Sequence, residues 1–306
     1  MSHNSNLTNH DPNAYRTHAS FVFSAANSAP VLGLLNPKPG EKIIDLGCGT
    51  GEITIAINQV VGQQGTVIGA DANQSMLDSA ASSEPSTIKW IQADIQAAES
   101  FAKAHPECEA AFDAVFTSAT LHWCKDSPEG VVQLIHWLLK PGGRMVFEFG
   151  GFGNGQVQAF SCRLQCLSAI CRCGVRAALH HAIRAKDIDP IPLDPWYFPT
   201  VKQYEKVLRS GGLIPSNVHL VPRPTPLPTT LEGWLITFAR NSFLSSFNDD
   251  EAKTIMKEVV EICRVDSYWS NENPGTGVKG SSEGGEGGES GWEVLYVRLR
   301  GVAHKP

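Results

Sequence analysis

A short glycine-rich segment, residues 45–51, has the residue types and spacing of a ligand-binding loop. It reads Asp-Leu-Gly-Cys-Gly-Thr-Gly, follows an apolar run that begins at Lys42, and precedes a stretch of helical period that begins at Glu52. Glycine has no Cβ, so such a loop lets bare backbone approach a ligand, and the first amides of the following helix point at it. The segment predicts a site for a nucleotide-like ligand, although a glycine loop by itself could also be a tight turn.

The spacing of the glycines argues against two common nucleotide sites. A dinucleotide-binding loop would need a further glycine at position 52, where Glu52 puts a carboxylate near the expected pyrophosphate. A nucleoside triphosphatase loop would end in Gly-Lys-Ser or Gly-Lys-Thr, which this segment lacks. Asp71 closes a second apolar run 24 residues after Gly47, where a carboxylate can accept both hydroxyl hydrogens of a ribose. NAD and nucleoside triphosphates are therefore disfavoured.

The segment resembles the cofactor loop of class I S-adenosylmethionine methyltransferases, which is written Asp-x-Gly-x-Gly-x-Gly. In that family the ligand end next to the loop carries a carboxylate and an ammonium group, so no phosphate has to be bound. The resemblance covers residues 32–150: Asp94 matches the family residue that hydrogen-bonds the adenine amine, with Ile95 beside the ring. It implies S-adenosylmethionine as cofactor, S-adenosylhomocysteine as product, and the cofactor-binding residues Asp45, Gly47, Cys48, Gly49, Thr50, Gly51, Asp71, Ala72, Met76, Asp94, Ile95 and Ser118.

Residues 118–123, Ser-Ala-Thr-Leu-His-Trp, lie where these enzymes present the methyl acceptor. They lack the Asn/Asp-Pro-Pro-aromatic stretch of enzymes that methylate nucleic-acid bases, and the chain shows neither the paired glutamates of protein arginine methyltransferases nor the Pro-Cys nucleophile for cytosine C5. Residues 23–30, 118–123, 196–197 and 296–300 are similar to trans-aconitate methyltransferases and their relatives, which esterify small carboxylic acids. The chain departs from that pattern in a Gly-rich tract at 275–291 and a cysteine-rich segment at 161–176.

A carboxylate acceptor would need no general base, because it is ionised at neutral pH and can attack the methyl group of a sulfonium directly. Catalysis would then consist of holding the oxygen in line with the methyl carbon and excluding water. Carboxylates that do not react would need cationic or hydrogen-bonding partners. The resemblance and this chemistry together give the candidate substrate residues Phe21, Phe23, His122, Trp123, Trp196, Tyr197, Arg298 and Arg300, with His122 as the catalytic candidate through positioning.

Three functions remain open at this point. The favoured one is an O-methyltransferase that forms a methyl ester on a small di- or tricarboxylic acid, such as an aconitate-like or aromatic diacid. The second is a natural-product methyltransferase that alkylates a hydroxyl, nitrogen or carbon with His122 as general base. The third is a cofactor-binding protein without methyl transfer, against which the intact glycine loop and Asp71 argue. His122 could instead be structural, and Arg298 and Arg300, which share one face of a strand, could belong to a solvated edge.

The elements that must position these residues follow from the hydrophobic pattern, in which apolar runs alternate with stretches of helical period from residue 42 to 149. We expect an α/β fold: a doubly wound Rossmann-like methyltransferase sheet with helical cap insertions. The predicted strands are 42–46, 66–71, 88–92, 114–117 and 144–149, with helices at 52–61, 75–81, 97–104 and 131–139. Further helices are predicted at 156–186, 201–210, 231–247 and 249–265, and a terminal strand at 293–303 is expected to add to the far edge of the sheet.

The same pattern divides the chain into a core with additions. The division is an N-terminal lid segment at 1–30, an S-adenosylmethionine-binding core at 31–155, a helical cap at 156–200 and 225–270, the C-terminal part of the core sheet at 201–224 and 292–306, and a flexible Gly/Ser/Glu loop at 271–291. The loop has no apolar anchor that could offset its ordering entropy.

The composition, 42% hydrophobic and 18% charged, is that of a globular protein. A net charge of −6 gives no general attraction to nucleic acid or anionic membrane, so we expect a small-molecule carboxylic acid as partner, no nucleic acid and no membrane, with a homodimer possible. The polar segment 1–20 has no apolar core and predicts a cytoplasmic protein. No second metal-binding knuckle accompanies the clustered cysteines, so we expect no metal and interpret them as small hydrophobic residues in a reducing compartment. They are Cys162, Cys166, Cys171 and Cys173.

Overall fold

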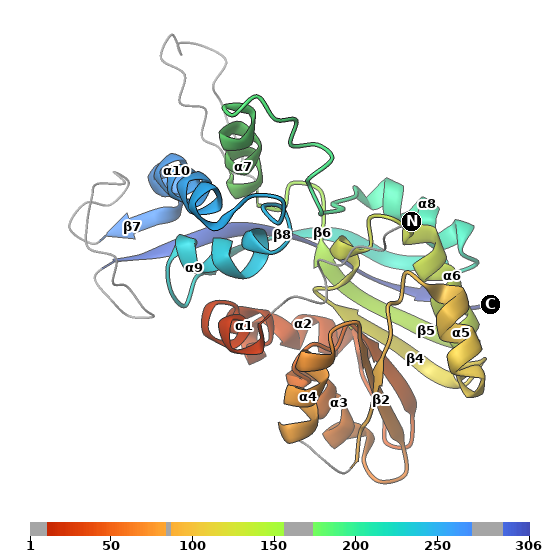
Figure 1. The fold of residues 1–306 in the computed structure, drawn as a ribbon. Coiled ribbons are helices and arrows are strands. Elements are labelled where there is room, and N and C mark those ends of the chain that lie inside the picture. The colour runs from red at the N-terminus through yellow and green to blue at the C-terminus, as the bar shows by residue number, and fades with distance from the viewer. Residues whose placement is uncertain (1–10, 84–86, 156–173, 271–289) are drawn as a thin grey trace.

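The computed structural model describes residues 11–83, 87–155, 174–270 and 290–306. Its centre is an eight-stranded sheet in the order β3-β2-β1-β4-β5-β8-β6, with the short β7 paired to β8 off this path (Figure 1). Strands β1 to β5 are parallel, β8 is antiparallel to β5, and β6 is antiparallel to β8. This topology confirms the predicted doubly wound α/β fold. The strands are β1 (Lys42–Leu46), β2 (Thr66–Asp71), β3 (Lys89–Gln92), β4 (Phe112–Ser118), β5 (Leu139–Gly150), β6 (Ile214–Pro226), β7 (Tyr268–Ser270) and β8 (Ser290–His304).

Helices cover both faces of the parallel strands. One apolar cluster joins Val31 and Ile57 to the sheet, and another joins Ile135 and Leu208 to it. All residues of β5 from 145 to 150 are buried, which explains why, apart from Glu148, this stretch of the strand is apolar on both faces instead of alternating. The helices of this part are α2 (Ala25–Leu35), α3 (Glu52–Val61), α4 (Gln74–Ser83), α5 (Ala98–Ala104), α6 (Pro128–Leu138) and α8 (Val201–Ser210).

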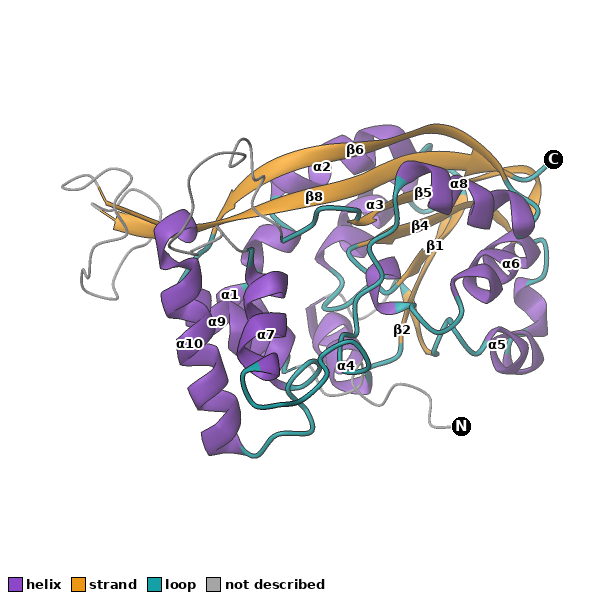
Figure 2. Ribbon diagram, turned by 90° about the horizontal axis from the view of Figure 1, so that it is seen from above, coloured by secondary structure: helices purple, strands orange, loops and turns teal. Residues whose placement is uncertain are grey.

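A second apolar core lies at the end of the sheet where β6 and β8 run on beyond the parallel strands (Figure 2). There α7 (Val175–Arg184), α9 (Leu231–Leu235) and α10 (Asp249–Ser267) enclose a cluster rich in aromatic side chains. The N-terminal helix α1 (Pro12–His18) lies between this helical end and α4 (Figure 1). The molecule thus has two cores, and the carboxyl ends of the parallel strands face the space between them.

The single helix expected at 231–247 is wrong in its second half. After α9 the chain makes one π-helical turn, Ile236–Arg240, and continues in turns. The Ser242 hydroxyl donates to the Phe238 carbonyl at 2.5 Å, and the Ser245 hydroxyl donates to the Ser242 carbonyl at 2.8 Å. Such side-chain bonds to nearby carbonyls compete with the helical hydrogen-bond ladder, and the helix ends there.

The expected position of the terminal strand at the far edge of the sheet is also wrong, because β8 lies between β5 and β6. The prolines of β6 explain the order. Positions 215, 222, 224 and 226 of β6 are proline and have no N–H to donate, so this strand suits an edge, whereas β8 contains no proline. Residues of β8 are consequently covered on both sides, and the alternative of a solvated edge strand for its arginines does not hold.

Some expectations fall on residues that the structure does not describe. Within the helix expected at 156–186 the structure describes α7, while Cys162, Cys166, Cys171 and Cys173 lie outside the described residues, as does most of the loop predicted at 271–291. The domain boundaries stay predictions. Among the described ranges, no helix is long and apolar enough to cross a membrane. No group of three or more His, Cys, Asp or Glu side chains that could hold a metal ion occurs in that part of the chain.

Candidate active site

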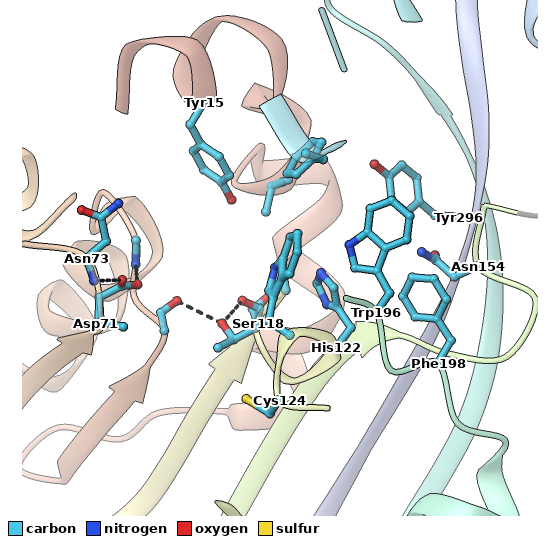
Figure 3. Close-up of a pocket in the computed structure, with 18 of the residues that line it drawn as sticks. Tyr15, Asp71, Asn73, Ser118, His122, Cys124, Asn154, Trp196, Phe198 and Tyr296 are labelled. Atoms are coloured by element: carbon cyan, nitrogen blue, oxygen red, sulfur yellow. Dashed lines mark hydrogen bonds between the residues drawn. The ribbon is translucent and has the colours of Figure 1, made fainter. Parts of the chain in front are cut away.

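A cavity of about 150 Å³ lies at the carboxyl ends of the parallel strands. The strand order reverses between β1 and β4, and ligands of open α/β sheets bind in the crevice at such a point. The cavity runs from Asp71 and Asn73 on one side, past Ser118 and His122, to Tyr296 on the other (Figure 3). We call the part next to the loop 45–51 and Asp71 the sheet-side half, and the part next to Tyr296 the cap-side half.

The glycine loop forms one wall of the sheet-side half. Gly47, Gly49 and Gly51 have φ angles of 76°, 55° and 84°, in the left-handed region that favours glycine. A Cβ at Gly47 would lie 2.6 Å from Thr120 Cβ and closer still to the Thr120 hydroxyl, and one at Gly51 would lie 2.7 Å from the Trp90 ring. Thr120 Oγ1 is within hydrogen-bond distance of the Gly47 carbonyl oxygen at 3.1 Å. The loop is thereby fixed against the segment that follows β4.

Two carboxylates line the sheet-side half. Asp71 accepts the backbone N–H of Gly49 through Oδ2 and that of Asn73 through Oδ1, both at 2.9 Å, which fixes its side chain at the end of β2. Burial raises the pKa of Asp71. Asp94 accepts the backbone N–H of Gln96 at 2.9 Å. Each carboxylate oxygen has a further lone pair, so both side chains can still accept a hydrogen bond from a ligand.

The sheet-side half fits a nucleoside. Met76, Ala93 and Ile95 line it with apolar surface on which a flat base can lie. Asp71 can accept ribose hydroxyls, Asp94 can accept an exocyclic amine, and the glycine loop leaves room for close approach. This donor and acceptor set fits the adenosine part of S-adenosylmethionine.

The structure separates the predicted cofactor residues into two groups. Asp45, Cys48 and Thr50 do not line the main cavity; they surround a smaller adjoining pocket behind the loop, and Gly51 packs against Trp90. Asp45 is buried and accepts the Thr54 hydroxyl at 2.6 Å, and burial raises its pKa to about 7. Contact between these four residues and the cofactor stays a prediction. Those in the wall of the main cavity are Gly47, Gly49, Asp71, Ala72, Met76, Asp94, Ile95 and Ser118.

Aromatic side chains dominate the cap-side half. The Trp196 and Phe198 rings are stacked, with centroids 6.1 Å apart and planes 14° apart. The Trp234 indole N–H donates to the Tyr296 hydroxyl at 2.5 Å, so this wall is tied together across the cap. Burial raises the pKa of Tyr296 to about 12, and its hydroxyl therefore stays neutral. The aromatic residues that line the cavity are Tyr15, His122, Trp123, Trp196, Phe198, Trp234, Phe238 and Tyr296.

The predicted substrate residues divide in the same way. His122, Trp123, Trp196 and Arg298 line the cavity. The other four do not line it, and their role in substrate binding stays a prediction. Phe21 packs behind the wall on Tyr296, with ring centroids 5.5 Å apart, and Phe23 lies in the adjoining pocket. Tyr197 and Arg300 are the remaining two.

Tyr197 and Arg300 each stay out of the cavity wall for a local reason. Residues 196–198 belong to no helix or strand, and Tyr197 packs against the apolar core of the sheet, whereas Trp196 and Phe198 line the cavity. Burial and the charge of Glu129 raise the pKa of Tyr197 to about 12. Arg300 lies in β8 and donates through Nε to the Glu148 carboxylate at 2.6 Å.

Sequence analysis missed several residues of the cavity, above all Asn154, Arg176 and Phe198. Phe198 had a usable signal, because it lies two residues after Trp196, and residues two apart in an extended segment share a side. Asn154 and Arg176 had none: the Asn154 amide accepts the backbone N–H of Val297 at 2.9 Å, a contact across 143 residues of chain. The positions of Asn154 and Arg176 in the cavity wall depend on how the cap packs against the sheet.

The N-terminal helix α1 closes one side of the cavity. Tyr15 lines it, and the Tyr15 ring meets the Phe238 ring edge-on at 6.2 Å. Burial, followed by the charge of Glu52, raises the pKa of Tyr15. Arg16 pairs with Glu52 at the start of α3 at 3.4 Å, and on the cap side His18 Nδ1 lies 2.8 Å from the Thr229 hydroxyl. Helix α1 thus connects the glycine loop to the cap, as a lid would.

Comparison with known proteins gives related enzymes. A methyltransferase-domain family model matches residues 37–159. An uncharacterized methyltransferase of Schizosaccharomyces pombe is 28% identical over 300 residues, 95% of this chain and 96% of that protein. Trans-aconitate 2-methyltransferase of Deinococcus radiodurans is 34% identical over 129 residues, 41% of this chain and 45% of that enzyme. Ubiquinone/menaquinone biosynthesis C-methyltransferase of Vibrio campbellii is 34% identical over 37% of this chain and 42% of that enzyme. The chain thus spans less than half the length of the last two.

Solved structures share the fold. A Bacillus halodurans protein described as a methyltransferase aligns with a TM-score of 0.55 and 13% identity, over 92% of this chain and 99% of that one. At this identity the likeness shows the fold alone. The methyltransferase-domain match gives the activity, and it covers the glycine loop and the strands β1 to β5. The chain is therefore a class I S-adenosylmethionine-dependent methyltransferase.

Proposed function

We propose that this methyltransferase forms a methyl ester on one carboxylate of a small di- or tricarboxylic acid, such as an aconitate-like or aromatic diacid. The observation that carries the proposal is the distribution of charge among the described residues of the cavity wall. Asp71 and Asp94 belong to the sheet-side half, whereas Arg176 and Arg298 belong to the elements of the cap-side half. An anionic acceptor is repelled by the first pair and attracted above all by Arg298, because Arg176 is paired with Asp194. It therefore enters the half that the cofactor leaves free.

Methylation of a carboxylate requires no acid or base group from the protein. When bound, S-adenosylmethionine supplies a methyl group on a positively charged sulfur. A carboxylate is ionised at neutral pH, so no side chain has to remove a proton from it. The aromatic wall excludes water from the acceptor, and His122 and Ser118 line the passage between the two halves, where they can orient the reacting oxygen (Figure 3). His122 then acts by positioning.

A transfer assay with radiolabelled S-adenosylmethionine tests this proposal. The acceptor panel contains mono-, di- and tricarboxylic acids, with phenols and amines as the contrast. We expect labelled product from di- or tricarboxylic acids, and we expect mild base to release the label as methanol, because the product is an ester. Transfer to phenols or amines with none to any acid would contradict the proposal.

The position of His122 favours a second candidate. Its ring lines the cavity 5.2 Å from the Trp123 ring and 6.0 Å from the Phe198 ring, measured between centroids, so it is placed to serve as general base for a hydroxyl, nitrogen or carbon acceptor. The variant His122→Gln separates the two candidates. With a carboxylate acceptor we expect mainly a higher KM, whereas loss of kcat by about 100-fold or more would favour general-base catalysis.

A homodimer and a cytoplasmic location also stay predictions. Light scattering of the purified protein at micromolar concentration tests the first, and a mass of twice 33.1 kDa is the expected result for a dimer.

A further inference from the structure

One carboxylate behind the cap-side half is surrounded by three arginines. Glu148 lies near the end of β5, and Arg223, Arg298 and Arg300 reach it from β6 and β8. Arg300 Nε donates to Glu148 Oε2 at 2.6 Å, and an Arg223 terminal nitrogen donates to Glu148 Oε1 at 3.2 Å. Three positive charges therefore face one negative charge, and this cluster of four side chains has a net charge of +2.

The sheet register produces this cluster. Glu148 pairs with Arg300 across β5 and β8, and Arg298 lies two residues earlier on the same face of β8. Arg223 enters from β6, where it pairs with Tyr296. The antiparallel strands that follow the parallel core thus bring three side chains with the same charge together at the end of the cavity.

Arg298 is the member of the cluster that lines the cavity, and it is the least satisfied. Its side chain is 4% exposed, yet its Nε lies 3.8 Å from Glu148 Oε1, beyond hydrogen-bond distance. Arg298 Nε has no hydrogen-bond partner among the described residues. The guanidinium lies over the Tyr296 ring, 4.8 Å from its centroid, which gives only a cation–π contact. A buried charge with so little compensation is costly unless an anion joins it.

The other arginine of the cavity wall does not share this property. Arg176 Nε donates to Asp194 Oδ2 at 2.6 Å, and His180 Nε2 lies 2.8 Å from the same oxygen. The charge of Arg176 is therefore offset within the protein. At the Glu148 cluster, burial, followed by the charge of Arg298, lowers the pKa of Arg223 to about 10, which is the response expected of crowded like charges.

We propose that Arg298 binds a second, non-reacting carboxylate of the methyl acceptor, and that the enzyme selects dicarboxylic over monocarboxylic acids by this contact. The proposal rests on the proposed function, because it takes the reacting group to be a carboxylate. The part of the acceptor between the two carboxylates would lie against Trp196, Phe198 and Tyr296, so a flat unsaturated or aromatic spacer fits best.

The variant Arg298→Met tests this contact without creating a new unpaired charge. Glu148 keeps Arg300 at 2.6 Å and Arg223 at 3.2 Å, so removal of Arg298 only lowers the surplus of positive charge. Arg298→Lys keeps the charge but loses the planar fork of donors. Arg209→Met is the matched control, because Arg209 is exposed on α8 and, among the described residues, pairs with Glu205 of its own helix. All variants are first compared with wild type in thermal unfolding and in calorimetric binding of S-adenosylhomocysteine.

The probes are two pairs of flat acids of similar size, fumarate with crotonate and terephthalate with 4-methylbenzoate. Affinity is measured by calorimetry with S-adenosylhomocysteine bound, and transfer is measured with labelled S-adenosylmethionine. We expect wild type to prefer the diacid of at least one pair by tenfold or more. Arg298→Met should weaken binding of that diacid by about 10- to 100-fold and leave its monoacid partner unchanged, with partial recovery in Arg298→Lys.

The outcomes distinguish this inference from the proposed function. Methylation of acids with no preference for diacids, or equal losses for both acids of a pair in Arg298→Met, overturns the role of Arg298 and leaves the proposed function standing. Diacid binding that depends on Arg298 without methylation of any acid supports the anion site and contradicts the proposed function. If Arg298→Met fails to fold, an Arg298→Lys variant that binds both acids as wild type does overturns the inference.

Discussion

A single added methyl group in the glycine loop should disable cofactor binding. The change is Gly47→Ala. Gly47 has a φ of 76°, and a Cβ there would lie 2.6 Å from Thr120 Cβ, with the rest of the Thr120 side chain closer still. The Thr120 hydroxyl lies 3.1 Å from the Gly47 carbonyl oxygen and 3.0 Å from the Ser118 carbonyl oxygen, and these two acceptors share its single hydrogen, so the side chain cannot move aside freely. The loop itself must shift away from the segment after β4.

Two costs set the size of the effect. A non-glycine residue in the left-handed region costs about 1–2 kcal/mol, and forcing an extra methyl into a packed site costs about 1–3 kcal/mol. If the loop relaxes by moving, binding must restore its shape, and a total of about 2–5 kcal/mol corresponds to a loss of about 30- to 4,000-fold in affinity. Gly40→Ala is the matched control: Gly40 has a φ of 86°, but no other group lies within 4 Å of the position that its Cβ would take, and it does not line the cavity.

Calorimetry with S-adenosylhomocysteine and thermal unfolding of each variant measure both parts of the effect. Gly40→Ala should lose stability only, whereas Gly47→Ala should lose affinity. Thr120→Gly in the Gly47→Ala background should recover the steric part, because all three atoms that meet the new Cβ belong to the Thr120 side chain. An affinity of Gly47→Ala within threefold of wild type, at the stability of Gly40→Ala, would refute this reasoning.

Three further predictions concern the residues around the loop. Asp71→Asn should weaken S-adenosylhomocysteine binding by about 10- to 100-fold in calorimetry, since one amide oxygen cannot replace the two carboxylate oxygens that hold Gly49 and Asn73; an unchanged Kd would contradict the assigned role. Burial raises the pKa of Asp45 to about 7, so the folded state keeps a proton that the unfolded state loses near pH 4, and stability should fall as pH rises between about 4 and 7 and level off above. Asp45→Asn should lose less stability than wild type over this range. The free energy of unfolding in urea is measured for both proteins at pH 5 and pH 8, and the two losses should differ by a few kcal/mol at most; equal losses in both proteins would count against the prediction. Deletion of residues 1–19 should raise the Kd of S-adenosylhomocysteine by about tenfold or more, because Tyr15 leaves the cavity wall; unchanged affinity and turnover would show that α1 is no lid.

The chemistry of the sheet-side half could be predicted from the sequence because it is local. The glycine loop and Asp71 belong to one β-α-β unit, in which strand length, helix length and the right-handed crossover place the ends of β1 and β2 side by side. Alternation of apolar runs and helical period was enough to locate β1 to β4 within two residues, whereas β5 begins five residues before the predicted strand. Periodicity therefore predicted the sheet, and the resemblance of the glycine loop, Asp71 and Asp94 to the methyltransferase family indicated the cofactor.

The cap-side half depended on contacts that no local pattern encodes. Tyr296 meets Trp234, Asn154 meets Val297, and Glu148 meets Arg300 across 62, 143 and 152 residues of chain. Periodicity shows that two residues share a face of one element, but not which element that face will meet.

The placement of β8 between β5 and β6 determined the environment of the β8 arginines. It turned the arginines of an expected edge strand into buried charges beside the cavity, because both sides of the strand became covered. The sequence by itself determined the glycine loop and the carboxylate that line the predicted cofactor site, through short-range spacing in one folding unit. Only the tertiary structure decided which cations line the cavity, because that depends on strand order and on the packing of distant side chains.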